Sequence, residues 1–221
     1  MSFLQMNLID FPTKDSYLFL TGESGKLELL ISPDAHNKND KIAIICHPHP
    51  LYQGTMDNKV VHTIHKALHS IEFTTIRFNY RGVGRSDGEY GDSIGESQDL
   101  RTIINWVQSV QPTSKILLAG FSFGAFIALK ESKNINCMQL ISVAPAVQNQ
   151  NYDLYLPIEC PWLVIQGEED EIIPPQLVFD WLDSLEKKPD IIKFPHTGHF
   201  FHGELINLRN KIIEYMTQTP Y

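Results

Sequence analysis

The amino-acid sequence predicts an α/β domain with a mostly parallel central sheet, an N-terminal antiparallel hairpin and helices on both faces. Three observations predict this architecture. From Lys41 onward, short apolar runs alternate with segments of helical periodicity. Two short runs, Tyr17–Thr21 and Lys26–Ile31, flank a turn at Gly22–Gly25, as in a β-hairpin. An apolar strand also leads through Gly120–Gly124 (GFSFG) directly into an apolar helical segment.

Length and composition limit the possible functions. A chain of 221 residues with 43% hydrophobic and 20% charged residues is typical of one soluble globular domain, here 1–221. The net charge of −8 argues against nucleic-acid partners and anionic membrane surfaces, and suits a monomer or small homo-oligomer. No apolar run approaches the roughly 20 residues of a membrane helix. Met1–Asp10 lacks the features of a signal peptide, and Cys46, Cys137 and Cys160 form no paired motif. We therefore expect a cytoplasmic protein with reduced thiols.

Each element in the first half of the chain has a local reason. Lys41–Cys46 (KIAIIC) is a continuous apolar run, as expected for a strand that is buried on both faces. Asn58–Ser70 carries apolar residues at helical spacing, and Asn58 and Asp57 are the candidate caps of that helix. Phe73–Phe78 is the next predicted strand.

The second half repeats the alternation. Ile94–Gln108 is a predicted helix with one apolar side, and Ile116–Ala119 is the strand before GFSFG. Pro175–Ser184 begins with a proline, which favours a helix start. The remaining predicted strands are Gln139–Val143, Trp162–Gln166 and Asp190–Phe194, and the last predicted helix is Glu204–Thr217.

Chemically active side chains follow three of these strands. Ser122 stands in a G-x-S-x-G turn between strand and helix, where the sharp turn strains the serine and exposes its hydroxyl. An acidic loop containing Asp170 follows Trp162–Gln166, and His199 follows the last strand. In an open parallel sheet such residues gather at the carboxyl edge. A serine needs a base, and the base needs a carboxylate, so the order Ser…Asp…His predicts nucleophilic catalysis.

These motifs resemble those of the α/β-hydrolase family over nearly the whole chain. The matching pieces are GFSFG, GEEDEIIP, TGHFFHG, NYRGVGRSDG and HPHPLYQGTMDNKVV. The last is similar to a bacterial subgroup of small, lidless hydrolases related to the dienelactone-hydrolase-like and prolyl-oligopeptidase-like branches. The resemblance implies a single-domain α/β-hydrolase fold without a large lid, with Ser122 as nucleophile, Asp170 as acid and His199 as base.

Several neighbours of these residues compete for the same roles. Glu168, Glu169 and Glu171 share the acidic loop with Asp170, and a solvated acidic surface is their simplest interpretation. His196 and His202 flank His199 and are candidates for supporting groups.

The oxyanion hole is expected to use the N–H of Phe123 and one donor from the loop after Lys41–Cys46. Pro48 and Pro50 have no N–H, which leaves His49, Leu51 and Tyr52. Aligning this loop with the family's His-Gly-x motif favours Leu51. The subgroup has a second glycine where this chain has Gln53, so the path of the loop stays open.

Neither the histidines nor the glycines of the chain form a metal-binding or nucleotide-binding motif. His62, His65 and His69 lie near one predicted helix face, but no H-E-x-x-H or H-x-H-x-D-H motif is present, so we expect no metal. Nucleotide-binding glycine motifs are absent, so we expect no cofactor.

Two arginines follow the strand Phe73–Phe78. Arg81 and Arg85 are expected to pair internally with Asp87 or Asp92 rather than to bind substrate.

The predicted function is a serine hydrolase that cleaves small acyl or aryl esters through an acyl-enzyme. The link Ala144–Pro161 has only 18 residues, too few for a large lid, so the site should be shallow. Thioesters and small peptides remain alternative substrates, and a catalytically idle binding module is the alternative from another class. The predicted pocket residues are Tyr52, Phe121, Pro145, Tyr152 and Tyr155.

Overall fold

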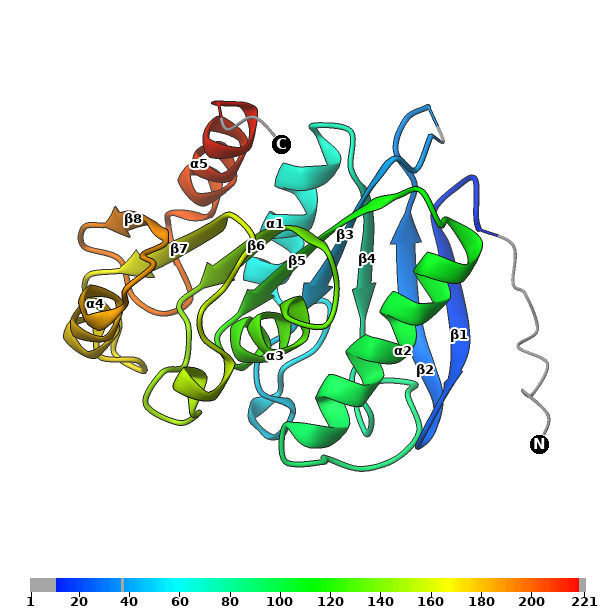
Figure 1. Ribbon diagram of the computed structural model, residues 1–221, viewed down its shortest axis with the longest axis horizontal. Helices are drawn as coiled ribbons and strands as arrows, with labels where there is room; N and C mark the ends of the chain where they lie inside the picture. The colour runs from blue at the N-terminus through cyan, green and yellow to red at the C-terminus, as the bar shows by residue number, and fades with distance from the viewer. Residues whose placement is uncertain (1–10, 37, 219–221) are drawn as a thin grey trace.

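The computed structural model describes residues 11–36 and 38–218, so the Met1–Asp10 segment that was assessed for a signal peptide lies outside the described residues. One eight-stranded sheet runs through the molecule in the order β1-β2-β4-β3-β5-β6-β7-β8 (Figure 1). Its strands are β1 Ser16–Gly22, β2 Gly25–Ser32, β3 Lys41–Cys46, β4 Thr74–Phe78, β5 Lys115–Phe121, β6 Cys137–Val143, β7 Trp162–Gly167 and β8 Asp190–Phe194.

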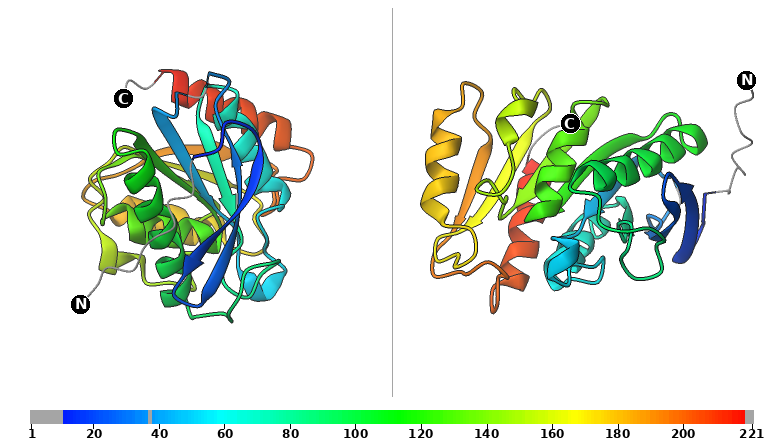
Figure 2. Two further views of the ribbon diagram at one scale, coloured as in Figure 1. Left: turned by 90° about the vertical axis from the view of Figure 1, so that its right-hand side faces the viewer. Right: turned by 90° about the horizontal axis from the view of Figure 1, so that it is seen from below.

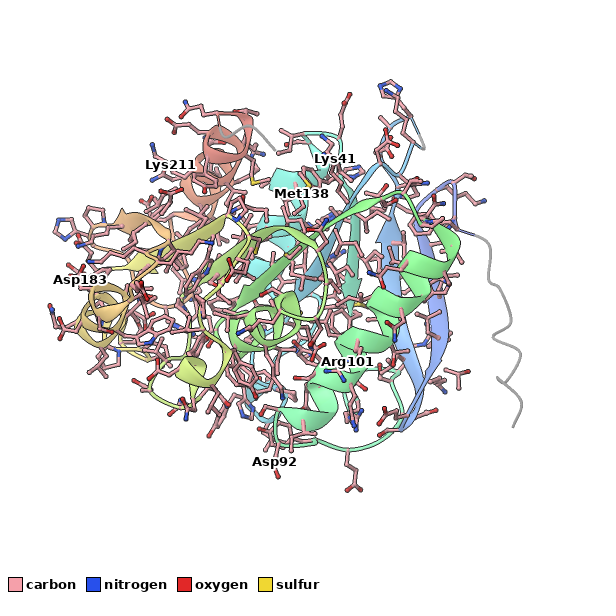
Figure 3. All side chains as sticks on the ribbon, viewed as in Figure 1. Lys41, Asp92, Arg101, Met138, Asp183 and Lys211 are labelled. Atoms are coloured by element: carbon pink, nitrogen blue, oxygen red, sulfur yellow. The ribbon has the colours of Figure 1, made fainter. Side chains whose placement is uncertain are left out.

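Helices cover both faces of the sheet. On one face lie α1 Lys59–His69 and α5 Leu205–Gln218, and on the other lie α2 Ile94–Val110, α3 Phe123–Ser132 and α4 Pro175–Ser184 (Figure 2). Each layer of helices packs its apolar side on the sheet, which creates two separate hydrophobic cores. Charged side chains such as Asp183 and Lys211 lie on the outer sides of the helices (Figure 3). The fold class predicted from the sequence is confirmed.

The pairing of the strands places all candidate residues at one edge. β1 and β2 form the predicted hairpin, with Gly22 opposite Gly25, and β2 also pairs antiparallel with β4. Every pair from β4 through β3 and β5 to β8 is parallel. Because parallel strands end at the same edge, the segments after β3, β5, β7 and β8 lie together there.

The start of α1 corrects one detail of the capping prediction. The side-chain oxygen of Asn58 accepts the N–H groups of Val60 and Val61 at 2.8 and 3.4 Å, as expected for an N-cap. Asp57 instead forms an ion pair with the buried Arg77 at 3.2 Å.

The partners predicted for the two arginines were wrong. Arg81 binds Asp99 of α2 through its guanidinium at 2.8 Å and its backbone N–H at 2.9 Å. Arg85 lies 3.6 Å from Glu28. Asp99 is completely buried, and a buried carboxylate is costly unless a charged partner and hydrogen bonds satisfy it. Arg81 therefore neutralises the buried carboxylate of Asp99 and does not pair with the carboxylates that lie near it in the sequence.

The link between β6 and β7 contains one short 3₁₀ turn, η2 Tyr152–Tyr155, and no lid domain. A second 3₁₀ turn, η1 Pro50–Tyr52, follows β3. Within residues 11–36 and 38–218, no helix has both the length and the apolar character needed to span a bilayer.

Candidate active site

Ser122 occupies a strained turn between β5 and α3. Its backbone has φ 56° and ψ −117°, a conformation that non-glycine residues rarely adopt. A Cβ on Gly120 would lie 2.1 Å from the carbonyl oxygen of Gly124, and a Cβ on Gly124 would lie 2.3 Å from that of Cys46. Both glycines are therefore required for β5, α3 and the end of β3 to approach so closely. The Ser122 N–H is anchored to the Val143 carbonyl at 2.9 Å.

The structure brings Ser122, His199 and Asp170 into one hydrogen-bonded line. His199 Nε2 lies 3.2 Å from Ser122 Oγ, and His199 Nδ1 lies 2.8 Å from Asp170 Oδ2. An ionised carboxylate accepts the proton of Nδ1, which leaves the Nε2 lone pair directed at the serine hydroxyl. The three side chains come from the ends of β5, β7 and β8, as the order of the motifs predicted.

Asp170 is held in its charged form by several donors. Its Oδ1 accepts the N–H groups of Ile172 and Ile173 at 2.9 and 2.7 Å, and its Oδ2 also accepts Gln166 Nε2 at 3.0 Å. Burial alone would raise the pKa of Asp170, but the hydrogen bond and charge of His199 and the two backbone amides lower it below its ordinary value. Ionised Asp170 thus stabilises the fold above its unfolded-state pKa, and this contribution is lost as pH falls through the lowered folded-state pKa.

Glu171 has a role that the sequence did not reveal. Its Oε2 accepts the backbone N–H of His199 at 3.0 Å, and a Cβ on Gly198 would lie 2.5 Å from the same oxygen. Glu171 therefore fixes the loop that carries His199, although the acidic run suggested only a solvated surface. Glu169, in the same loop, instead pairs with the exposed His196 at 2.8 Å. The signal for Glu171 lies in Gly198, which leaves room for a carboxylate beside His199.

Replacing Glu171 with alanine is expected to lower kcat about tenfold, because His199 loses a charged acceptor worth about 1.5–3 kcal/mol, part of which the loop recovers by relaxing. Glu171→Gln keeps an acceptor oxygen and should restore most of the rate. Steady-state kinetics on a chromogenic ester measure both. Glu168→Ala on the same loop is the control, and an equal loss in that variant would show that the loop charge matters rather than this hydrogen bond.

The loop after β3 presents the candidates for the oxyanion hole. Phe123 is the first residue of α3, where backbone N–H groups have no acceptor within the helix. The Leu51 N–H donates to His49 Nδ1 at 3.2 Å, whereas the Tyr52 N–H donates to the His49 carbonyl oxygen at 3.1 Å. Gln53 takes φ 61° and closes η1, so it adopts the left-handed conformation that suits glycine. This loop needs no second glycine to turn.

The predicted pocket residues fall into two groups. Tyr52 is 83% exposed beside the site. Phe121 and Pro145 are buried, and the Phe121 ring lies beneath His199 with centroids 4.9 Å apart. Tyr152 is also buried and packs on Phe126 and Trp181, because η2 is anchored in the core.

Tyr155 completes the predicted set. It is half-buried against Phe126, with ring centroids 5.7 Å apart. Phe121, Pro145 and Tyr152 are thus buried and Tyr155 is half-buried, whereas Phe200, which was not among the predicted pocket residues, is 39% exposed with its ring centroid 5.1 Å from that of His199.

Two of the three histidines of α1 make hydrogen-bond contacts with neighbouring elements. His65 Nδ1 lies 2.7 Å from Thr75 Oγ1, and His69 Nδ1 lies 3.3 Å from the Phe73 carbonyl oxygen. Burial and neighbouring positive charges lower the pKa of His65 to about 3. Among the residues that the structure describes, no group of three or more metal-binding side chains is arranged to hold an ion.

Comparisons with known proteins place this geometry in a family. The model of a family described as serine aminopeptidase, S33, matches residues 54–159. A protein of Rickettsia prowazekii is 31% identical over 211 residues, which cover 90% of this chain and 87% of that protein.

Two solved structures are also similar. A serine hydrolase without a lid from Xanthomonas campestris is 38% identical, with a TM-score of 0.91 over 96% of this chain and 100% of that chain. A serine hydrolase homologue from Coxiella burnetii is 38% identical, with a TM-score of 0.89 over 93% of this chain and 99% of that chain. These matches and the arrangement of the sheet show that the chain belongs to the α/β serine hydrolase superfamily, among its members without a lid.

Proposed function

We propose that this protein is a serine hydrolase that cleaves small acyl or aryl esters in the cytoplasm, with Ser122, His199 and Asp170 as its catalytic triad. The observation that carries the proposal is the line of hydrogen-bond distances, 3.2 Å from Ser122 Oγ to His199 Nε2 and 2.8 Å from His199 Nδ1 to Asp170. It supports the proposal because a serine hydroxyl becomes a useful nucleophile only beside an oriented base.

The proposed reaction is a two-step acyl transfer. His199 Nε2 removes the hydroxyl proton as Ser122 Oγ attacks the acyl carbon, and ionised Asp170 stabilises the imidazolium that forms. The tetrahedral oxyanion is stabilised by the N–H of Phe123 and a second donor, proposed to be Leu51. His199 then gives its proton to the leaving alcohol, the ester bond breaks, and water repeats the sequence on the acyl-enzyme.

Leu51 can act as that donor only after a local change. Its N–H is bonded to His49 Nδ1, whereas the hydrogen bond that occupies the Tyr52 N–H is part of the η1 turn itself. The His49 ring rests between the rings of Tyr52 and Phe123, with centroids 4.9 and 4.8 Å apart. We propose that a bound substrate turns the His49 ring and frees the Leu51 N–H.

The aromatic surroundings suggest the size and character of the substrate. Tyr52 and Phe200 expose ring surface on the loops that follow β3 and β8, and Leu51 is 66% exposed next to Tyr52. The 18-residue link from Ala144 to Pro161 places no lid over this surface. A shallow site with aromatic borders favours short acyl chains and aryl groups over long-chain lipids.

A fluorophosphonate probe tests the proposal directly, because it phosphonylates only an activated serine. We expect stoichiometric labelling of the wild type, with the adduct on a peptide that contains Ser122, and no labelling of Ser122→Ala. Failure of the wild type to react, or equal labelling of Ser122→Ala, would favour an idle binding module with this fold.

Acyl chain length is expected to control kcat/KM on p-nitrophenyl esters. Chains of two to four carbons should be preferred, with activity falling beyond about eight carbons because a shallow pocket leaves the added methylenes in water. A rate that still rises beyond that length would contradict the shallow site.

A small-peptide hydrolase is the second candidate, and the description of the matching family model favours it. Aminoacyl p-nitroanilides and the corresponding p-nitrophenyl esters have the same acyl groups but different leaving groups, so comparing them separates the two activities. Measurable amide cleavage at a rate near that of the ester would favour the peptidase.

A further inference from the structure

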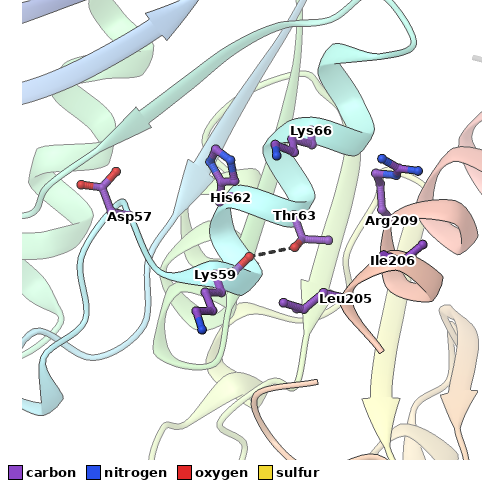
Figure 4. A pocket seen from close by; sticks show the side chains of 8 residues that line it. All are labelled: Asp57, Lys59, His62, Thr63, Lys66, Leu205, Ile206 and Arg209. Atoms are coloured by element: carbon purple, nitrogen blue, oxygen red, sulfur yellow. Dashed lines mark hydrogen bonds between the residues drawn. The ribbon is translucent and has the colours of Figure 1, made fainter. Parts of the chain in front are cut away.

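A pocket of about 300 Å³ lies against α1 and the start of α5, and none of the triad residues lines it (Figure 4). Four of its lining residues come from α1 and three from α5. The lining residues are Asp57, Lys59, His62, Thr63, Lys66, Leu205, Ile206 and Arg209. Neither the proposed triad chemistry nor the packing of the cores uses the basic side chains of this pocket.

The pocket combines three cations that have no acidic partner. In the part of the chain that the structure describes, no carboxylate lies within ion-pair distance of Lys59, Lys66 or Arg209, although Arg209 donates to the neutral side-chain oxygen of Asn210 at 3.3 Å. Asp57, the acidic residue of the pocket, is already neutralised by Arg77 at 3.2 Å. The whole chain has a net charge of −8, but the three unpaired cations make the surface around this cavity locally positive.

The lowered pKa of His62 also indicates a positive electrostatic field in the pocket. Burial lowers the pKa of His62, and the positive charges of Arg77 and Lys66 lower it further against the opposing effect of Asp57. The pocket thus holds a half-buried imidazole in a positive field, where an anion would be attracted.

We propose that this pocket binds the phosphate group of a small phosphate monoester. A phosphate carries about −1.5 to −2 charges at neutral pH, which the unpaired cations can balance. Arg209 can donate two parallel hydrogen bonds to phosphate oxygens, and Lys59 and Lys66 act as point charges.

The apolar residues of the pocket favour a ligand with an organic part. Leu205 and Ile206 line the same cavity, and Ile206 is 72% exposed. Ligand pockets usually measure roughly 300–1,000 Å³, so this cavity suits a phosphate with a small organic group rather than a large cofactor.

Titration of the full-length protein with phenyl phosphate and with inorganic phosphate, at constant ionic strength, tests the proposal. Backbone amide shifts in α1 and α5, followed by NMR, report binding at this pocket and separate it from any binding near Ser122. The test variant is Lys66→Gln/Arg209→Gln. The matched control is Lys187→Gln/Lys188→Gln, which removes the same charge from residues that pair with Glu159 and Asp183 at another surface.

We expect saturable shifts of the amide signals in α1 and α5, and tighter binding of phenyl phosphate than of inorganic phosphate. The affinity of the test variant for phenyl phosphate should be at least about tenfold weaker than that of the wild type. The control variant should bind like the wild type. The proposal is overturned if phenyl phosphate produces no saturable shifts there, or if both double variants weaken binding equally. Inorganic phosphate binding as tightly as phenyl phosphate would overturn the assignment of a monoester. Because the readout is binding, the result does not depend on esterase activity.

Discussion

Ser122→Ala is expected to lower kcat for ester hydrolysis by about 10⁴-fold or more, with the fold unchanged. The side chain of Ser122 makes no capping hydrogen bond to α3, so its loss removes no structural contact beyond that with His199. Removing the nucleophile of a triad leaves only the residual catalysis of the oxyanion hole and of substrate binding, which accounts for the size of the effect. Stopped assays on p-nitrophenyl acetate, with active-site titration of the wild type, measure it.

Ser132→Ala is a matched control for that experiment. Ser132, the last residue of α3, is also a buried serine, and its hydroxyl donates to the Leu129 carbonyl oxygen within the helix. It should keep its activity and lose at most about 1 kcal/mol of stability. If Ser122→Ala kept a rate within tenfold of the wild type, the hydrolysis would have to come from another group, and the triad proposal would fail.

Local sequence patterns were sufficient to predict most of the secondary structure. Lys41–Cys46 and Pro175–Ser184 have the bounds that were predicted, because an unbroken apolar run and a proline at a helix start are strong local signals. The order of the strands was not predicted. β4 lies between β2 and β3 because distant segments pair, and hydrophobic periodicity contains no information on such pairing.

The residues of the candidate site also fall into those that local motifs predict and those that only long-range contacts reveal. Ser122, Asp170 and His199 stand in local motifs, so their positions after three strands were readable. Glu171 accepts a backbone N–H from a residue 28 positions away, and the one local sign of that contact, Gly198 before His199, does not say which acidic side chain fills the space. Arg81 was assigned the wrong partners for a related reason, since proximity in sequence favoured Asp87 or Asp92 over the buried Asp99.

The strained backbone of Ser122 requires close contact between β5, α3 and the end of β3. Gly120 and Gly124, the two glycines of the G-x-S-x-G turn, allow this contact. Gly124→Ala is therefore expected to destabilise the protein by about 3 kcal/mol or more. The added Cβ would lie 2.3 Å from the Cys46 carbonyl oxygen and 2.6 Å from that of His47, and backbone atoms cannot move aside as a side chain can. β3 is paired on both sides, so the strain has to be relieved by shifting α3 or the loop after β3. Urea denaturation of the wild type and the variant measures the loss.

The same displacement should lower the activity of the molecules that still fold, because α3 carries Phe123 and the loop after β3 carries Leu51. Gly203→Ala is the control: a Cβ there meets nothing within 4 Å, so only its φ of 81° opposes the change. That variant should lose about 1 kcal/mol and keep its kcat. Equal losses of stability in the two variants would contradict this explanation, because Gly124 lies within α3, is not among the positive-φ glycines, and has only the contact with the end of β3 to oppose a Cβ. A larger loss in Gly124→Ala, with a lower kcat per folded molecule, would tie the close packing of β3 and α3 to the position of the proposed oxyanion donors.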